Sequence, residues 1–118
     1  MKMVVAVTHG TDDPTQATLG ILAAKAAAEQ GHEVTVWLQG EGASLANREI
    51  YPHVQGVNMP ALKDALEDLV AREVPVWVCK ACAAGRGVGE ANAIATATFR
   101  TMGEFVGAVA EADRNIDF

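Results

Sequence analysis

The chain has 118 residues, half of them hydrophobic and a fifth charged, which suits one globular domain spanning residues 1–118 around a single core. Nine lysines and arginines against fifteen aspartates and glutamates give a net charge of −6, and the basic residues are scattered, so we expect no direct binding to nucleic acid. No apolar run approaches the roughly 20 residues that span a bilayer. The N-terminus has the pattern of a strand rather than a signal peptide, and we predict a cytoplasmic protein without membrane contact.

The first third of the chain predicts a strand, a helix and a second strand. Residues 3–7 form a continuous apolar run that ends at a turn, which is typical of a buried strand in a parallel sheet. An alanine-rich helix follows: Asp13 can cap it, Pro14 suits its first position, and Gly31 is placed to end it. Residues 32–38 then form the second strand.

The rest of the chain continues the alternation of helices and strands. A glycine-containing loop and a turn-rich segment separate the second strand from the next helix. The expected elements are a helical patch at 44–50, a helix from 58 or 59 to 71, a strand at 75–79, a helix at 103–112 and a short strand at 114–118. Residues 89–103 carry no clear pattern. The alternation predicts an α/β fold, a single three-layer α/β/α domain with a mainly parallel sheet and helices on both faces.

Ligand sites in such sheets lie beyond the carboxyl ends of the strands. Three segments reach that edge, namely 8–13, 39–44 and 79–89. The third holds both cysteines of the chain, Cys79 and Cys82, directly after the apolar strand.

The position of Cys79 favours a reactive thiolate. The N–H groups at a helix start carry partial positive charge, Lys80 and Arg86 add cationic charge nearby, and Cys82 can donate a hydrogen bond to the sulfur. We therefore expect Cys79 to have the lower pKa and the greater access, and Cys82 to pack inward as the accessory thiol. Cys79 would accept or transfer sulfur, or form a disulfide with Cys82.

Two other readings of the cysteines stay open. Free cysteine is among the most buried residue types, so both thiols could simply fill the core. A structural zinc site needs about four ligands, whereas the sequence has one cysteine pair and three histidines far apart, His9, His32 and His53. The glycines at 85–89 lack the spacing of a dinucleotide or phosphate loop. We expect neither zinc nor an organic cofactor.

His9 lies on the turn after the first strand, with Thr8 and Asp12. If the first and third strands are neighbours, His9 could tune or protonate Cys79. The favoured alternative is a hydrogen bond within the turn.

Several segments together resemble the DsrE/DsrF-like (TusD-like) family of sulfur-relay proteins. They are, in chain order, T15-Q16-A17, G31-H32-x-V34, C79-x-x-x-A83-x-x-R86-G87-V88 and D113-R114-x-I116-x-F118. The resemblance implies a flavodoxin-like (DsrEFH-like) fold, homo- or hetero-oligomers, and a persulfide on Cys79 that passes between protein partners. Cys82 departs from the small residue that sulfur-transfer members carry at its position.

Three functional hypotheses follow. The leading one is a small sulfur-carrier or sulfurtransferase-like protein acting through Cys79 with donor and acceptor proteins. The second is a thiol redox or sensing protein that uses a Cys79–Cys82 disulfide, and the third is a non-catalytic oligomeric binding module. The resemblance implies a homotrimer or homohexamer, and apolar surface on residues 17–28 and 116–118 gives a physical motive for self-association.

Overall fold

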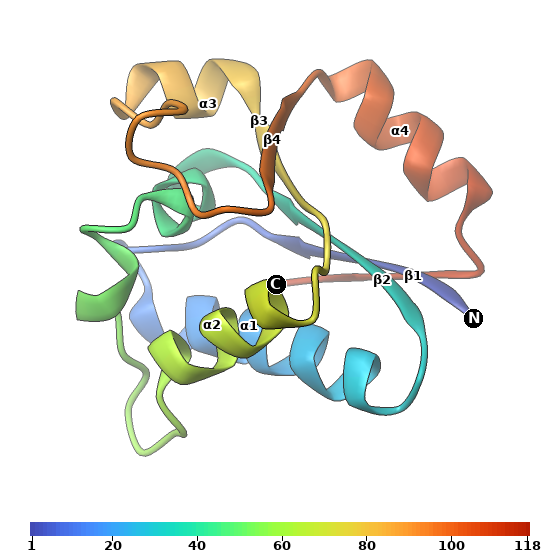
Figure 1. Cartoon of the computed structure of the whole chain (residues 1–118), viewed down its shortest axis with the longest axis horizontal. Coiled ribbons are helices and arrows are strands. Elements are labelled where there is room, and N and C mark those ends of the chain that lie inside the picture. The colour runs from blue at the N-terminus through green and yellow to red at the C-terminus, as the bar shows by residue number, and fades with distance from the viewer.

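The computed structural model describes residues 1–118 and contains one five-stranded sheet with the order β4-β3-β2-β1-β5 (Figure 1). Every neighbouring pair of strands is parallel. The strands are β1 (Lys2–Val7), β2 (Glu33–Leu38), β3 (Val76–Cys79), β4 (Ala97–Arg100) and β5 (Arg114–Asp117). The helices are α1 (Pro14–Glu29), α2 (Leu62–Ala71), α3 (Lys80–Gly85) and α4 (Met102–Glu111), and the 3₁₀ segments are η1 (Gly40–Ala46) and η2 (Tyr51–His53).

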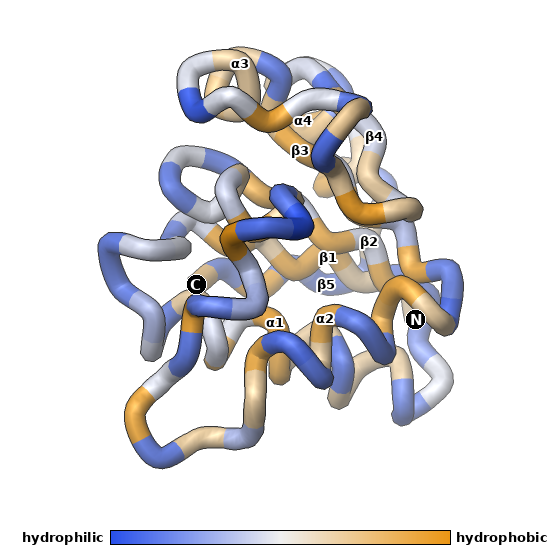
Figure 2. The backbone as a smooth tube through the Cα atoms, turned by 60° about the vertical axis from the view of Figure 1, so that its left-hand side comes forward, coloured by the Kyte–Doolittle hydropathy of each residue, from blue (hydrophilic) through white to orange (hydrophobic).

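Helices cover both faces of the sheet, so the predicted α/β architecture is confirmed. Figure 1 shows α1 and α2 below the strands and α4 above them. Side chains alternate between the faces, as the pleat of a strand requires. Val5 and Val7 join the large core cluster with α1 and α2, whereas Val4 and Ala6 belong to a small cluster that α4 packs against. Figure 2 shows the hydrophobic stretches of β1, β2 and β3 in the middle of the molecule.

The predicted ends of α1 are confirmed. The Asp13 carboxylate accepts a hydrogen bond from the backbone N–H of Gln16 at 3.1 Å, and Pro14 is the first helical residue. Gly31 follows the C-cap with φ +86°, a left-handed conformation that costs glycine little. The connection to β2 is therefore tight, and β1 and β2 lie side by side over their full length.

Helix α2 begins at Leu62, not at residue 58 or 59 as the sequence suggested. Asn58 has φ +55°, outside the helical region. Pro60 also disfavours a helical conformation at Met59, the residue before it. The turn-rich segment thus continues up to Ala61, which is the N-cap.

Two other boundaries differ from the sequence-based expectation. The helical patch expected at 44–50 is replaced by two 3₁₀ segments, η1 and η2, one starting earlier and one later. The unassigned residues 89–103 contain β4, a four-residue strand at the edge of the sheet with no fully buried residue. So short a strand, only partly buried on the side of Ala97 and Phe99, leaves little hydrophobic alternation in the sequence.

The apolar surface expected on residues 17–28 is mostly covered within the chain itself. Ala17, Ile21 and Ala24 are fully buried, because α1 packs on both the sheet and α2. The C-terminal Phe118 joins the core, and its backbone N–H donates to the Ala6 carbonyl at 2.8 Å. The large exposed hydrophobic side chains of helix α4 are Met102 and Val106, at 52% and 58% exposure. Leu19 of α1 and Ile116 of β5 are 37% and 38% exposed, so α4 carries more exposed apolar side chains than α1 or the C-terminal strand.

No helix in the structure combines the length and the hydrophobicity that crossing a membrane requires.

Candidate functional site

Three loops meet at the carboxyl edge of the sheet, following β1, β2 and β3. Glycine permits this contact, because a Cβ atom at Gly42 would overlap the Val7 carbonyl and one at Gly10 would overlap the Glu41 carbonyl. Segment η1 therefore lies directly against the loop that follows β1. It also contacts β3 and α3, which brings its backbone to the two cysteines.

Cys79 is the last residue of β3 and the N-cap of α3. Its side chain is only 9% exposed and packs with Val4, Ala6 and Trp37 on the α4 side of the sheet. The strand thus delivers the sulfur to the interior rather than to an open crevice.

Burial raises the pKa of the Cys79 thiol, because removing a thiolate from water is costly. A hydrogen bond with the Cys82 side chain raises the pKa further, while the N–H groups of Cys82 and Ala81 at the start of α3 act in the opposite direction. The expectation of a lowered pKa and greater access at Cys79 is therefore wrong. The N–H groups at the start of α3 do lower the pKa of Cys79 as predicted, but burial raises this pKa by more.

Cys82 lies one turn further along α3 and is the more exposed of the two thiols. It packs partly against both core clusters. Its sulfur accepts a hydrogen bond from the backbone N–H of Gly40, with 3.2 Å between nitrogen and sulfur. Cys82 therefore does not turn fully inward, because its side chain faces η1 rather than the sheet alone.

Arg86 stands beside Cys82 but is already paired. Its Nε and Nη2 atoms donate to one carboxylate oxygen of Glu41 at 2.9 and 2.6 Å, and its Nη1 donates to the Cys82 carbonyl at 3.1 Å. Hydrogen bonding to Glu41 raises the pKa of Arg86, with a smaller contribution from negative charge on the two cysteines. The predicted cation is thus present, and Glu41 fixes it in place. Lys80 is exposed on α3.

His9 lies in the turn and bonds within it. Its Nδ1 is 2.9 Å from a carboxylate oxygen of Asp12, and strand β2 separates β1 from β3. The hydrogen bond from the Gly10 N–H, followed by that of His9, lowers the pKa of Asp12. His9 therefore supports the loop rather than contacting Cys79, which agrees with the favoured sequence interpretation.

The other histidines lie apart from the thiols. His32 contacts the N-terminal amine at 3.0 Å, and His53 is on η2. No three His, Cys, Asp or Glu side chains come together as a metal site would require.

Aromatic side chains surround the small cluster that contains Cys79. Trp37 and Trp77 are partners across β2 and β3, and Phe105 of α4 stacks on Trp37 with 4.5 Å between ring centroids. The Arg100 guanidinium lies 4.3 Å from the Trp77 ring centroid. Both tryptophans therefore act as packing residues.

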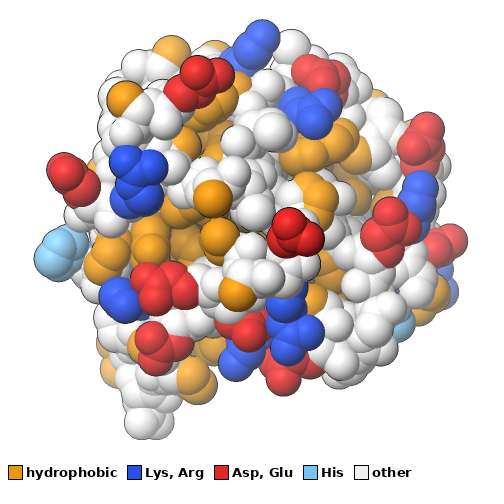
Figure 3. All heavy atoms as spheres, viewed as in Figure 1, with side chains coloured by type: hydrophobic (Ala, Val, Ile, Leu, Met, Phe, Trp, Pro, Cys, Tyr) orange, Lys and Arg blue, Asp and Glu red, His pale blue; other side chains and the backbone are white.

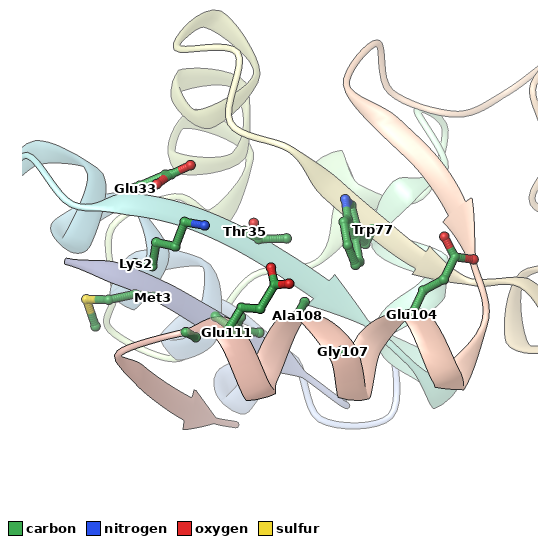
Figure 4. Close-up of a pocket in the computed structure, with 11 residues that line it drawn as sticks. Lys2, Met3, Glu33, Thr35, Trp77, Glu104, Gly107, Ala108 and Glu111 are labelled. Atoms are coloured by element: carbon green, nitrogen blue, oxygen red, sulfur yellow. The ribbon is translucent and has the colours of Figure 1, made fainter.

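A groove of about 360 Å³ lies between α4 and the sheet, and neither cysteine lines it (Figure 4). Trp77 and Ala108 form part of its wall, and Lys2, Glu33, Glu104 and Glu111 supply charge. Figure 3 shows basic and acidic side chains interspersed on the visible face, with no extended basic patch there.

The sequence predicts the sheet edge at which the structure has both cysteines, but it does not identify the contacts of Gly40 and Glu41. Both lie in segment 39–44, which was expected to reach the edge. A backbone N–H contact to sulfur and a long-range ion pair leave no periodic signal in the sequence. The conspicuous glycines of that segment are the signal that could have pointed to close backbone approach.

The whole chain, residues 1–118, matches the DsrE/DsrF-like family, and the protein belongs to this family. Two relatives come from Methanocaldococcus jannaschii. The uncharacterized protein MJ0989 is 27% identical over the full length of both chains. The uncharacterized protein MJ0760 is 29% identical over 91 residues, 77% of this chain, and the match spans only a third of the length of MJ0760.

Solved structures share the fold. The ychN protein from E. coli superposes with a TM-score of 0.84 at 22% identity, covering 100% of this chain and 99% of ychN. MTH1491 from Methanobacterium thermoautotrophicum, a protein of unknown function, gives 0.76 at 13% identity, covering 99% of this chain and 98% of MTH1491. At these identities the likeness concerns the fold alone.

Proposed function

We propose that the protein is a small sulfur carrier that holds persulfide sulfur on Cys79 and passes it to an acceptor protein. One observation carries the proposal: Cys79 ends a parallel strand at the start of α3, where two backbone N–H groups and a second thiol reach its sulfur. The two N–H groups, unlike the second thiol, can stabilise negative charge on the Cys79 sulfur during transfer. Membership of the DsrE/DsrF-like family, which includes sulfur-relay proteins, supports it.

The chemistry needs no external oxidant. A thiolate of the site attacks the terminal sulfur of a donor persulfide, the S–S bond of the donor breaks, and the donor leaves as a thiolate. Cys79 then carries –S–SH. The acceptor repeats the step, its thiolate attacking the terminal sulfur while Cys79 leaves as a thiolate.

Burial of Cys79 suits a store of sulfur. Val4, Ala6 and Trp37 surround its side chain, so a small thiol in solution has little access to a persulfide there. A carrier must keep its cargo until the acceptor docks. The more exposed thiol, Cys82, adjoins Cys79 on α3.

The proposal is tested by intact-mass analysis after incubation with glutathione persulfide. Wild type should gain the mass of one sulfur atom, which cyanide removes as thiocyanate. Cys79→Ser should hold no stable sulfur, whereas Cys82→Ser, which also lacks one thiol but keeps Cys79, should hold its sulfur once loaded. Failure of wild type to gain sulfur would contradict the proposal.

A dithiol redox role is the second candidate, and the hydrogen bond between the two cysteine side chains favours it. In that reaction Cys82 attacks the disulfide of a partner, and Cys79 then displaces the partner as a dithiol, leaving a Cys79–Cys82 disulfide. Exposure to oxidised glutathione would then remove the mass of two hydrogen atoms without adding glutathione. If this Cys79–Cys82 disulfide formed more readily than the persulfide, the result would favour the redox role over the carrier role.

We also propose that copies of the protein associate through α4. Met102 and Val106 are more than half exposed there, and Phe105 is only partly buried. A second copy packing on this helix would cover them, in a homotrimer or homohexamer. Light scattering should show one such oligomer, and Val106→Asp should lower the molecular mass toward that of one chain. A monomeric wild type at micromolar concentration would contradict this part.

A further inference from the structure

The two thiols of the site differ in burial and in hydrogen bonding. Cys79, here called the inner thiol, is 9% exposed under the α4 layer, and Cys82, the outer thiol, is half-buried on α3. The hydrogen bond between them raises the pKa of Cys79. The Cys82 side chain therefore favours the protonated form of Cys79.

The sulfur of the outer thiol accepts a hydrogen bond from the backbone N–H of Gly40, with 3.2 Å between nitrogen and sulfur. The position of this N–H is fixed by the fold. Gly40 has φ +56°, and Gly42 packs so closely on the Val7 carbonyl that a Cβ atom would overlap it. The N–H group is therefore already directed at the sulfur, without rearrangement on reaction.

Charge also gathers at the outer thiol. Arg86, the C-cap residue of α3, donates to the Cys82 carbonyl at 3.1 Å and makes two hydrogen bonds to one carboxylate oxygen of Glu41 in η1. The other charged or titratable group on α3 is the exposed Lys80, and β3 contributes Cys79. On the loop after β1, His9 and Asp12 are bonded to each other.

We propose that Cys82 is the receiving thiol of the site: it takes sulfur from the donor and hands it inward to Cys79. Gly40 and Arg86 act as positioning residues that hold negative charge on the Cys82 sulfur. This inference rests on the proposed sulfur-carrier function and assigns the order of its two steps.

Both steps balance. The Cys82 thiolate attacks the terminal sulfur of the donor persulfide R–S–SH, forming Cys82–S–SH and releasing R–S⁻. The Cys79 sulfur then attacks the terminal sulfur of Cys82–S–SH, and Cys82 leaves. The proton that Cys79 gives up returns to the pair through their hydrogen bond, so the net products are Cys79–S–SH and Cys82–SH. Nothing is oxidised or reduced overall.

The first experiment measures alkylation of Cys82 by iodoacetamide across pH in the Cys79→Ser background. Adding Arg86→Gln should slow labelling near neutral pH about tenfold, because a nearby cation favours the thiolate. Adding Glu41→Gln should speed it, since the neutral amide still accepts from Arg86 but no longer cancels its charge. Arg72→Gln is the matched control, an arginine that pairs with Asp68 on the far side of the sheet, and should change nothing.

If the Glu41–Arg86 pair had only a structural role, both substitutions would change the rate of Cys82 alkylation in the same direction. Equal slowing by Arg86→Gln and Glu41→Gln, or no change in either, would therefore overturn the assignment of Arg86. Far-UV circular dichroism of each variant checks that the fold is kept.

The second experiment follows sulfur loading from glutathione persulfide with time, quenching with iodoacetamide and mapping the modified peptide. Wild type should show sulfur on Cys82 before Cys79, and Cys82→Ser should load Cys79 at least about tenfold more slowly, having lost its accessible thiolate. Cys82→Ser loading Cys79 at the wild-type rate would overturn this inference and leave the carrier function intact. Absence of loading in wild type would overturn the carrier function itself, and this inference with it.

Discussion

The two faces of the sheet are built differently. On the side of α1 and α2, 23 buried residues form one continuous cluster that includes Val5, Val36 and Leu66. On the side of α4 only four buried residues cluster, Cys79 among them, and α4 itself has no fully buried residue. The first face supplies most of the apolar burial and hence most of the stability. The second is thinly covered, and it carries the inner thiol.

This difference indicates which face of a small α/β domain can hold a reactive group that must meet a partner. A reactive group on the α1–α2 face would lie under two helices and could not meet a partner protein. On the α4 face the inner thiol is shielded by few side chains, and the outer thiol lies at the rim. Two substitutions and one pH series test this difference between the two faces of the sheet.

The largest effect is expected on the densely packed face. Leu66 of α2 is fully buried, so Leu66→Ala should lower the free energy of unfolding by about 2–5 kcal/mol, through lost burial and the remaining cavity. Urea unfolding at fixed protein concentration measures it. Glu111→Ala, at the exposed C-terminal end of α4, is the control and should cost less than about 0.5 kcal/mol. Similar losses in both variants would remove the contrast between the faces.

A smaller effect is expected under α4. Phe105 stacks on Trp37 but is only partly buried, so Phe105→Ala should cost about 1–3 kcal/mol, less than a fully buried phenylalanine. It should also open the cluster that covers Cys79. Alkylation of Cys79 in the Cys82→Ser background should then become faster. Unchanged alkylation would show that α4 does not shield the inner thiol.

The smallest effect concerns pH. Burial raises the pKa of Cys79 above its ordinary value of 9.0, so the folded protein keeps this proton to higher pH than the unfolded chain. Below pH 9 both states hold the proton and the thiol causes no pH dependence; above it the unfolded chain binds fewer protons, and stability falls as pH rises. Wild type should therefore lose more stability between pH 8 and 10 than Cys79→Ala. Parallel curves would show that the folded environment does not disfavour the thiolate.

The sequence predicts the framework well because the framework depends on local patterns. Strands β1, β2 and β3 are apolar runs, and α1 has a capping Asp13 and a terminating Gly31. Strand β4 was missed because a four-residue edge strand has few buried positions. The start of α2 was placed too early because Asn58 adopts a left-handed conformation that composition does not announce.

The site was predicted in part for a similar reason. The spacing of Cys79 and Cys82 and their place after a strand are sequence features, and both thiols lie at the predicted edge. Which sulfur is buried depends on α4 and on the strand order, where β2 separates β1 from β3. The contacts of Gly40 and Glu41 join distant segments of the chain. Gly40 and Cys82 are 42 residues apart in the sequence, and Glu41 and Arg86 are 45 residues apart. No local pattern encodes such contacts.

The central claim is that the buried Cys79 is where the sulfur rests. The most direct measurement is peptide mapping of wild-type protein loaded to completion with glutathione persulfide, separated from the donor, and alkylated after unfolding. Both cysteines lie close together, so fragmentation between residues 79 and 82 locates the extra sulfur. We expect it on Cys79, and we expect Cys79→Ser to lose its sulfur rapidly to added dithiothreitol. Sulfur found on Cys82 alone, equally stable with and without Cys79, would contradict the account.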